Sequence, residues 1–119
     1  MNNPNWVTEL FDSIDSMDTN KFVSFLAEDA TFTFGNSPSA IGKEIVFQVV
    51  DGFFKSIKAI SHTDIQTFVD GDFVIARGNS TYTRHDASAL TVGFCNVFKM
   101  QNSLIQDYKI YIDLSQLYI

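Results

Sequence analysis

The feature that most constrains the fold is the second half of the chain, which from Ser61 onwards reads as strands separated by turns. Four stretches there alternate and are rich in β-branched and aromatic residues, a pattern typical of strands. Asp70-Gly71-Asp72 between the first two is a strong hairpin signal. Gly78, inside the second stretch, predicts a bulge or a bend. The predicted strands are residues 62–69, 73–84, 89–100 and 104–113.

The first half of the chain shows helical periodicity instead. Apolar residues from Trp6 to Met17 recur at helical spacing and predict one amphipathic helix. Asp18 or Thr19 can cap a second, short helix that carries residues 22–26. The remaining predicted elements of this half are a short strand over residues 30–34, a loop over 35–39 and a longer helix over 42–60.

Helices gathered before an antiparallel meander predict an α+β fold. Strands of about ten residues are longer than usual, so the sheet is expected to twist and curve strongly. We therefore expect a cone-shaped, curved antiparallel sheet with three N-terminal helices packed on its concave face. A chain of 119 residues is expected to form a single domain over residues 1–119.

The composition narrows the possible partners. Lys and Arg total 8 against 14 Asp and Glu, which gives a formal charge of -6 and a pI of about 4.5. A chain this acidic lacks the basic surface that phosphate backbones require, so we expect no nucleic-acid partner. The 12 Phe supply enough aromatic surface either for a bulky core or for the lining of an apolar cavity.

The cysteine content and the hydropathy of the chain indicate the cellular compartment in which the protein is expected. Cys95 is the only cysteine, so it forms neither an intrachain disulfide nor a cysteine-based metal site. No apolar run approaches the roughly 20 residues needed to span a bilayer. The N-terminal residues lack a basic region followed by an apolar stretch, which argues against a secretory signal. We therefore expect a soluble, cytoplasmic protein with no membrane partner.

The order and spacing of several segments resemble the nuclear transport factor 2-like superfamily, and within it the SnoaL-like polyketide cyclase group. The resemblance covers nearly the whole chain. The segments that carry it are Phe25-Leu-Ala-Glu-Asp-Ala-Thr-Phe32, Ile41-Gly42, His62, the hairpin at 70–72, and the last stretch from Tyr108 to Tyr118.

This resemblance implies a cone-like α+β barrel that often forms a homodimer through the sheet. It also implies a pocket in which carboxylates, His or Tyr handle protons on apolar small molecules. The superfamily includes cyclases, ketosteroid isomerases, epoxide hydrolases, dehydratases and members without catalysis. Likeness of fold alone does not choose among these activities.

Asp113 is the first candidate for chemistry. Strand alternation puts Lys109, Tyr111 and Asp113 on one face of the last predicted strand. In SnoaL-like proteins the aspartate of the final strand is the acid/base residue, and Asp113 matches that position. A carboxylate in an apolar pocket has a raised pKa and can exchange protons near neutral pH. The alternatives are that Asp113 caps the turn at Leu114-Ser115, or that Lys109 pairs with it and depresses its pKa.

His62 is the second catalytic candidate. An imidazole titrates near neutrality, so it can act as a partner acid or orient Asp113. The alternative is a histidine at the start of a strand that is hydrogen-bonded to backbone. Asp64 lies two residues further on and forms a His-x-Asp pair, but no third ligand is visible, so we predict no metal site.

Aromatic side chains are the candidates for substrate contact. Tyr82, Tyr111 and Trp6 can donate hydrogen bonds to a carbonyl oxygen, and phenylalanines can form an apolar wall. Each of them can equally be a core residue. The predicted substrate-binding residues are Trp6, Phe25, Phe34, Phe54, Tyr82 and Tyr111.

The leading hypothesis from the sequence is a small-molecule acid/base enzyme of the cyclase, isomerase or hydrolase type that needs no cofactor. Its substrate is expected to be apolar and to contain a carbonyl group. The competing hypothesis is a non-catalytic ligand-binding or dimeric interaction module of the same fold. A third possibility is a structural partner subunit.

Overall fold

The chain forms three helices and six strands in a computed structural model that describes residues 4–118. Residues 1–3 and 119, which belong to the predicted domain, lie outside the described residues. The helices are α1 (Asn5–Asp15), α2 (Thr19–Val23) and α3 (Lys43–Lys55). The strands are β1 (Leu26–Phe34), β2 (Ala40–Ile41), β3 (Ala59–Asp70), β4 (Phe73–Thr83), β5 (Ala89–Gln101) and β6 (Leu104–Tyr111).

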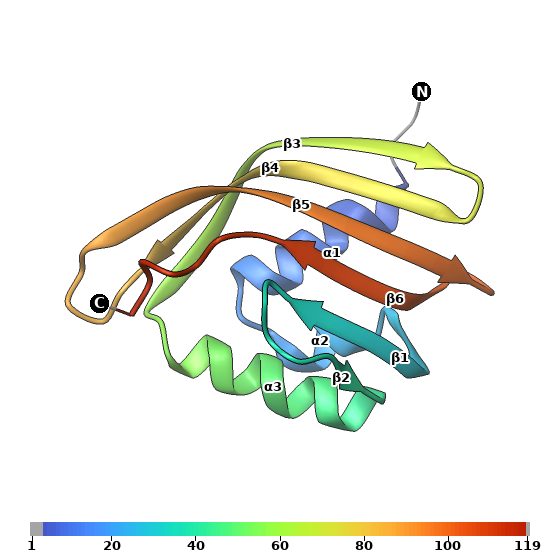
Figure 1. Ribbon diagram of the computed structural model, residues 1–119, viewed down its shortest axis with the longest axis horizontal. Coiled ribbons are helices and arrows are strands. Elements are labelled where there is room, and N and C mark those ends of the chain that lie inside the picture. The colour runs from blue at the N-terminus through green and yellow to red at the C-terminus, as the bar shows by residue number, and fades with distance from the viewer. Residues whose placement is uncertain (1–3, 119) are drawn as a thin grey trace.

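The strands form one six-stranded sheet in the order β2-β1-β6-β5-β4-β3. The three pairs of the predicted meander, β3 to β6, are antiparallel. Strand β2, which was not predicted, is antiparallel to β1, and β1 runs parallel to β6. A parallel pair needs a long connection, and here α3 and the meander of β3 to β5 supply it. Figure 1 shows the long strands β3, β4 and β5 arching over α1, with α2 and α3 on the same side of the sheet. The predicted α+β fold with three helices against a curved sheet is confirmed.

The helices are shorter than the periodicity predicted. α2 ends at Val23, and Leu26 begins β1, where it pairs with Ile105 of β6. The carboxylate of Asp18 accepts the backbone N–H of Lys21 at 3.0 Å, so Asp18 is the cap. The predicted helix over 42–60 ends at Lys55, because residues 59 and 60 pair with β4 and belong to β3. At the C-terminal ends of α2 and α3, pairing in the sheet therefore overrides the helical spacing of the sequence.

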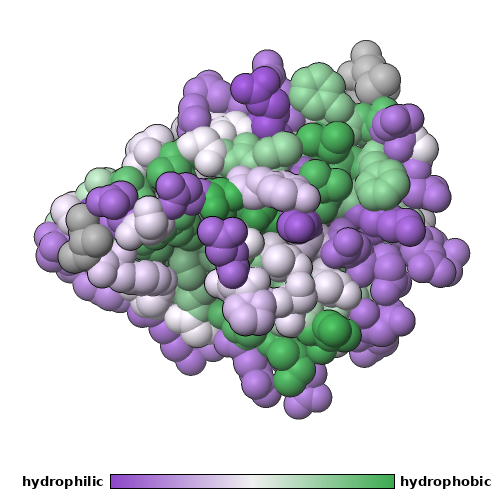
Figure 2. Space-filling view, viewed as in Figure 1, coloured by the Kyte–Doolittle hydropathy of each residue, from purple (hydrophilic) through white to green (hydrophobic). Residues whose placement is uncertain are grey.

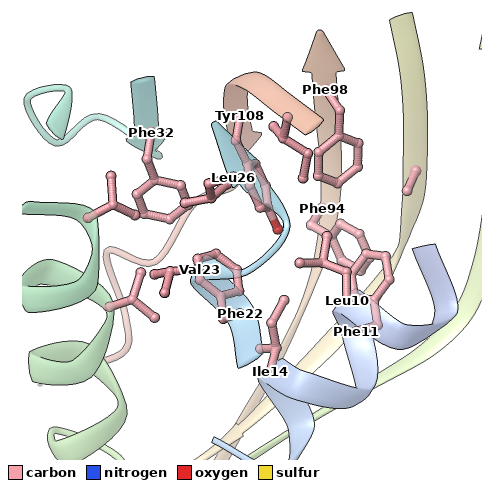
Figure 3. Packing of buried hydrophobic residues seen from close by; sticks show 14 of the residues in the cluster. Leu10, Phe11, Ile14, Phe22, Val23, Leu26, Phe32, Phe94, Phe98 and Tyr108 are labelled. Carbon is pink, nitrogen blue, oxygen red and sulfur yellow. The ribbon is translucent and has the colours of Figure 1, made fainter. Parts of the chain in front are cut away.

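A core of mostly apolar side chains joins the helices to the concave face of the sheet. Figure 3 shows Phe11 and Ile14 of α1, Phe22 of α2 and Phe94 of β5 turned towards the same interior. Tyr108 of β6 lies within this core, and its hydroxyl oxygen points between Phe22 and Phe94 (Figure 3). Tyr108 is fully buried and packs edge-on against Phe32, with ring centroids 5.1 Å apart.

The outer surface mixes polar and apolar side chains. Figure 2 shows hydrophobic side chains reaching one face in separate groups between hydrophilic ones. Phe68 and Phe73, near the β3–β4 hairpin, are among the exposed large apolar residues. Within the part of the chain that the structure describes, no helix is long and apolar enough to cross a membrane.

The curvature of the sheet coincides with a bulge in β3. Thr63 pairs with Asn79 and Gln66 with Arg77, so two residues of β3 lie opposite the single Gly78 of β4. A Cβ atom at Gly78 would lie 2.7 Å from the carbonyl oxygen of Thr63. The bulge predicted from this glycine is present, but the extra residue is on the neighbouring strand. The absence of a side chain lets the bulged backbone approach β4.

We expect Gly78→Ala to destabilise the fold, because the added methyl group meets backbone that cannot move without disturbing the sheet. The expected loss is about 1–3 kcal/mol in the free energy of unfolding, measured by urea denaturation. Gly93→Ala on the adjacent strand β5 is the matched control, because the nearest atom to its added Cβ is 3.9 Å away. Equal stabilities of the two variants would contradict the role of Gly78.

Candidate functional site

An apolar cavity lies between the helices and the concave face of the sheet. Its volume is about 50 Å³, which is room for a few water molecules. Most of its wall is aromatic or aliphatic and comes from α1, α2, α3 and the strands. We call it the inner cavity. Five polar side chains interrupt the apolar wall: His62, Ser80, Tyr82, Asn96 and Tyr108.

A second, larger pocket of about 670 Å³ adjoins the inner cavity, and we call it the outer pocket. Phe34 and Phe53 line both pockets and meet edge to face, with ring centroids 4.9 Å apart. Val49 and Ile112 also line both. The volume of the outer pocket lies in the range of small-molecule sites. The two pockets therefore share part of their walls.

The most distinctive polar contact of the site joins His62 to Asp15. Nδ1 of His62 lies 2.6 Å from Oδ1 of Asp15, and the backbone N–H of His62 donates to Oδ2 of the same carboxylate at 3.2 Å. The His62 side chain is 7% exposed and that of Asp15 is 32% exposed. A carboxylate accepts only, so the Nδ1–H of His62 is the donor. The neutral imidazole then carries its free lone pair on Nε2.

Local structure explains how these two residues meet. Asp15 is the last residue of α1, where the helix dipole disfavours a carboxylate, so an external partner is needed. His62 lies on β3 directly opposite Ser80 of β4, which turns both side chains to the concave face. Its ring packs against Phe11 and Phe94, with centroid distances of 4.8 and 5.3 Å. These contacts leave the imidazole few other orientations.

Ser80 and Tyr82 form a polar pair next to His62. Both are buried, and the Ser80 hydroxyl donates to the Tyr82 hydroxyl oxygen at 3.2 Å. Burial raises the pKa of Tyr82, so the phenol stays protonated. Because the oxygen of Tyr82 accepts from Ser80, its own proton remains available for a ligand in the cavity.

Asn96 and Tyr108 form a second polar pair on β5 and β6. Asn96 Nδ2 donates to the Tyr108 hydroxyl oxygen over a long 3.5 Å, and both residues are buried. Burial raises the pKa of Tyr108 strongly, so this phenol also remains a donor. The other amide atom, Asn96 Oδ1, is buried and has no hydrogen-bond partner among the described residues.

Asp113 does not have the environment that the sequence predicted. It follows the end of β6, is exposed, and lines only the outer pocket. Its carboxylate accepts the backbone N–H of Ser115 at 2.9 Å, which lowers its pKa instead of raising it. The predicted raised pKa is therefore wrong, and the alternative of a cap at Leu114-Ser115 is correct. The reason is strand alternation: Tyr108 and Ile110 face the cavity, so Lys109 and Tyr111 face away.

The predicted substrate-contact residues divide into two groups. Phe34, Phe54 and Tyr82 line the inner cavity. Trp6 packs instead against Phe98, with centroids 5.2 Å apart, and borders a separate surface pocket. Phe25 packs against the core at the start of β1, and Tyr111 is 52% exposed beneath the ammonium of Lys109. The prediction that Trp6, Phe25 and Tyr111 line the pocket is wrong.

The two side chains of the His-x-Asp pair, His62 and Asp64, have different partners. Asp64 is the first residue of the bulge in β3, and its carboxylate accepts a hydrogen bond from Asn79 at 3.3 Å. His62 is bound to Asp15 instead. Across residues 4–118, no group of three or more His, Cys, Asp or Glu side chains is arranged to hold a metal ion.

Sequence reasoning missed Asp15, Ser80, Asn96 and Tyr108. For Asp15 a usable signal existed, because an acid in the last turn of an apolar helix opposes the helix dipole. For Asn96 the signal was its place in the alternation of β5. It is a polar residue on the face that also carries Phe94 and Phe98. The pairing of Asp15 with His62, 47 residues apart, carries no local sequence signal.

Many solved protein structures are similar in fold to this chain. A candidate polyketide cyclase from Xanthomonas campestris pv. campestris is 17% identical, with a TM-score of 0.86 over 93% of this chain and 90% of that one. A protein with a ketosteroid isomerase-like fold from Catenulispora acidiphila, in complex with trimethylamine, is 16% identical, with a TM-score of 0.88 over 96% and 89%. A candidate isomerase from Bacillus subtilis is 17% identical, with a TM-score of 0.80 over 90% and 83%.

At these identities the solved structures are evidence for the fold alone. No curated protein sequence matches the chain. Residues 7–108, which include every strand up to the middle of β6, match the SnoaL-like domain. The chain therefore belongs to the SnoaL-like domain family.

Proposed function

We propose that this protein is an acid/base enzyme of the cyclase, isomerase or hydrolase type, acting without a cofactor on an apolar, carbonyl-containing small molecule. The observation that carries the proposal is the Asp15–His62 pair, because the imidazole lines an apolar cavity while its Nδ1 is held at 2.6 Å from a carboxylate. Nuclear transport factor 2-like neighbours described as candidate cyclases and isomerases are consistent with this class of reaction.

His62 is the proposed proton carrier. With Nδ1–H directed at Asp15, the lone pair of Nε2 can take a proton from a carbon next to a carbonyl group. The imidazolium that forms is stabilised by the carboxylate of Asp15, and it can return the proton to a different atom of the substrate. Asp15 is a positioning residue in this scheme, because it acts through the imidazole.

Tyr82 is the proposed hydrogen-bond donor to the substrate carbonyl. Its hydroxyl lies on the same face as His62, since Ile60 and His62 of β3 pair with Tyr82 and Ser80 of β4. When a proton leaves the neighbouring carbon, negative charge develops on the carbonyl oxygen. A buried phenol that stays protonated stabilises that charge in a medium of low polarity.

The shape of the site supports an elongated apolar substrate. The inner cavity of about 50 Å³ accepts only one end of a molecule, and the outer pocket of about 670 Å³ accepts the remainder. Aromatic side chains form the wall that the two pockets share, so a ring or alkyl chain is favoured there. The reacting carbonyl is then the end that enters the inner cavity.

The small inner cavity also favours the second candidate, a non-catalytic ligand-binding module. A ligand confined to the outer pocket would not reach His62 and would undergo no reaction. The two candidates differ in one measurable respect, which is proton transfer to and from a bound carbonyl compound. The homodimer through the sheet and the cytoplasmic location implied by the sequence remain predictions.

We expect His62→Gln to abolish catalysed proton exchange. α-Tetralone and related cyclic ketones are incubated with the protein in deuterium oxide, and deuterium uptake next to the carbonyl is followed by mass spectrometry. Loss of a general base lowers such a rate by about 10²–10⁴-fold. Asp64→Asn is the control and is expected to keep the native rate, because the exposed Asp64 lines neither pocket. If ketones bind and native protein catalyses no exchange, the ligand-binding module is the correct alternative.

We expect Asp15→Ala to change the tautomer of His62. Without the carboxylate, Nδ1–H loses its acceptor and the neutral ring redistributes its proton towards Nε2. Nitrogen-15 NMR of the imidazole reports this directly. In the exchange reaction kcat is expected to fall while KM stays nearly unchanged, because Asp15 touches the imidazole and not the substrate. An unchanged imidazole spectrum would contradict the positioning role.

The carboxylate of Asp113 is expected to stabilise the fold near neutral pH and to lose this effect in acid. Its pKa is lowered in the folded state, so the ionised group contributes stability that is present above its unfolded pKa and lost as pH falls through the folded pKa. Asp113→Asn keeps an oxygen for the Ser115 N–H but removes the charge. Urea unfolding is therefore expected to separate the two proteins near neutral pH and to bring them together in strong acid. A constant difference at all pH values would refute this account.

A further inference from the structure

Residues 112–118, which we call the C-terminal segment, form one wall of the outer pocket. They follow the end of β6 and are not paired with another strand. The members of the segment that line the outer pocket are Ile112, Asp113, Leu114, Ser115 and Tyr118. The other walls belong to α3 and to the residues around β1 and β2. Because the sheet does not hold the C-terminal segment, its place depends on contacts of another kind.

Arg84, the first residue after β4, supplies these contacts. Its Nε donates to the carbonyl oxygen of Leu117 at 2.8 Å, and its Nη2 donates to the carbonyl oxygen of Gln116, also at 2.8 Å. Nη1 donates to the Ser88 hydroxyl at 3.1 Å. Figure 1 shows the C-terminal segment running from β6 towards the β4–β5 turn, where Arg84 lies. The rigid fork of a guanidinium can bridge two consecutive carbonyl groups, which the compact ammonium of lysine does less well.

The turn that carries Arg84 is held by hydrogen bonds of its own. The Arg84 backbone N–H donates to the Ser88 carbonyl oxygen at 2.7 Å. The Ser88 N–H and hydroxyl both donate to Oδ1 of Asp86, at 2.9 and 2.6 Å. The Arg84 side chain therefore extends from an ordered turn of the sheet to a segment that has no strand partner.

Two contacts of the C-terminal segment complete the wall. The Leu117 side chain is buried in the core, and the exposed Tyr118 borders the outer pocket. The Tyr118 hydroxyl lies 2.6 Å from Oγ of Ser56, the residue that follows α3. Ser56 Oγ donates its single proton to the Phe53 carbonyl oxygen at 2.6 Å, so Tyr118 is the donor to Ser56. Tyr118 thus connects the C-terminal segment to α3 at the border of the pocket.

We propose that Arg84 is a positioning residue for ligand binding, because it holds the C-terminal segment where Leu114 and Tyr118 meet a ligand in the outer pocket. Arg84 itself lines neither pocket, so its effect passes through the segment. Without the guanidinium, the segment occupies its native place for a smaller fraction of the time. The dissociation constant of a ligand that needs this wall then rises by the inverse of that fraction. The inference rests on the proposed use of the outer pocket for substrate recognition.

The test measures ligand affinity by isothermal titration with 4-phenylcyclohexanone, an elongated apolar ketone. Arg84→Gln is expected to raise its dissociation constant about three- to tenfold, because two charge-assisted hydrogen bonds to the segment are lost. Arg84→Lys is expected to raise it less, since the ammonium can still bind one carbonyl oxygen. Arg77→Gln is the matched control and is expected to keep the native value, because the exposed Arg77 of β4 lines neither pocket.

Amide hydrogen exchange reports the order of the C-terminal segment separately from affinity. Residues 112–118 are expected to exchange faster in Arg84→Gln than in native protein or Arg77→Gln, and the rise in the dissociation constant is expected to follow this loss of protection. Faster exchange with an unchanged dissociation constant would overturn the inference. In native protein, which needs no variant to fold, the bound ketone is expected to slow exchange in the segment. A bound ketone that leaves this exchange unchanged would also overturn the inference.

The kinetics of proton exchange on the same ketone separate this inference from the proposed function. Arg84→Gln is expected to raise KM and to leave kcat unchanged, because His62 and Asp15 keep their contact. A lower kcat with an unchanged KM would overturn the role of Arg84 alone. Affinity that depends on Arg84, in a native protein that catalyses no proton exchange, would overturn the proposed function alone. Failure of the ketone to bind native protein would count against both.

Discussion

The close approach of the bulged strand β3 to Gly78 is the constraint on which the site depends. Two residues of β3 lie opposite this one glycine, and bulges of this kind bend a strand and increase its twist. His62 lies two residues before the bulge, and its side chain contacts Asp15 at the end of α1. The bend therefore brings an imidazole from the sheet within 2.6 Å of a carboxylate from the helix.

The second organising principle is the contrast between an apolar wall and a few paired polar groups. Burial makes each unpaired polar atom costly, so the cavity contains donors and acceptors only where neighbours hold them. Ser80 holds the Tyr82 hydroxyl and Asp15 holds His62, which leaves one proton donor and one proton acceptor directed at a ligand. Asn96 Oδ1 is the exception, since no described group pairs with it.

The fold was more predictable from the sequence than the site. Strand alternation and turn residues located β3 to β6 within a few residues, because these signals are local. Alternation divides the residues of β6 between two faces of the strand. It does not show which of these faces the helices cover, so the cavity-lining face was not predictable. Choosing the face of Asp113 excluded Tyr108, which has the opposite phase. The pairing of His62 with Asp15 was also not predictable from the sequence, because only the tertiary fold brings the two residues together.

In the proposed function, the outer pocket serves recognition and the inner cavity serves proton transfer. The outer pocket is large and lined by residues of the β1–β2 loop, α3 and the C-terminal segment, so it can accommodate varied apolar shapes. The inner cavity is small, and its wall includes the buried polar side chains of the site. Binding affinity is then expected to come mainly from apolar area in the outer pocket. Selection of the reacting group follows from hydrogen bonds in the inner cavity, where an unmatched polar atom is most costly.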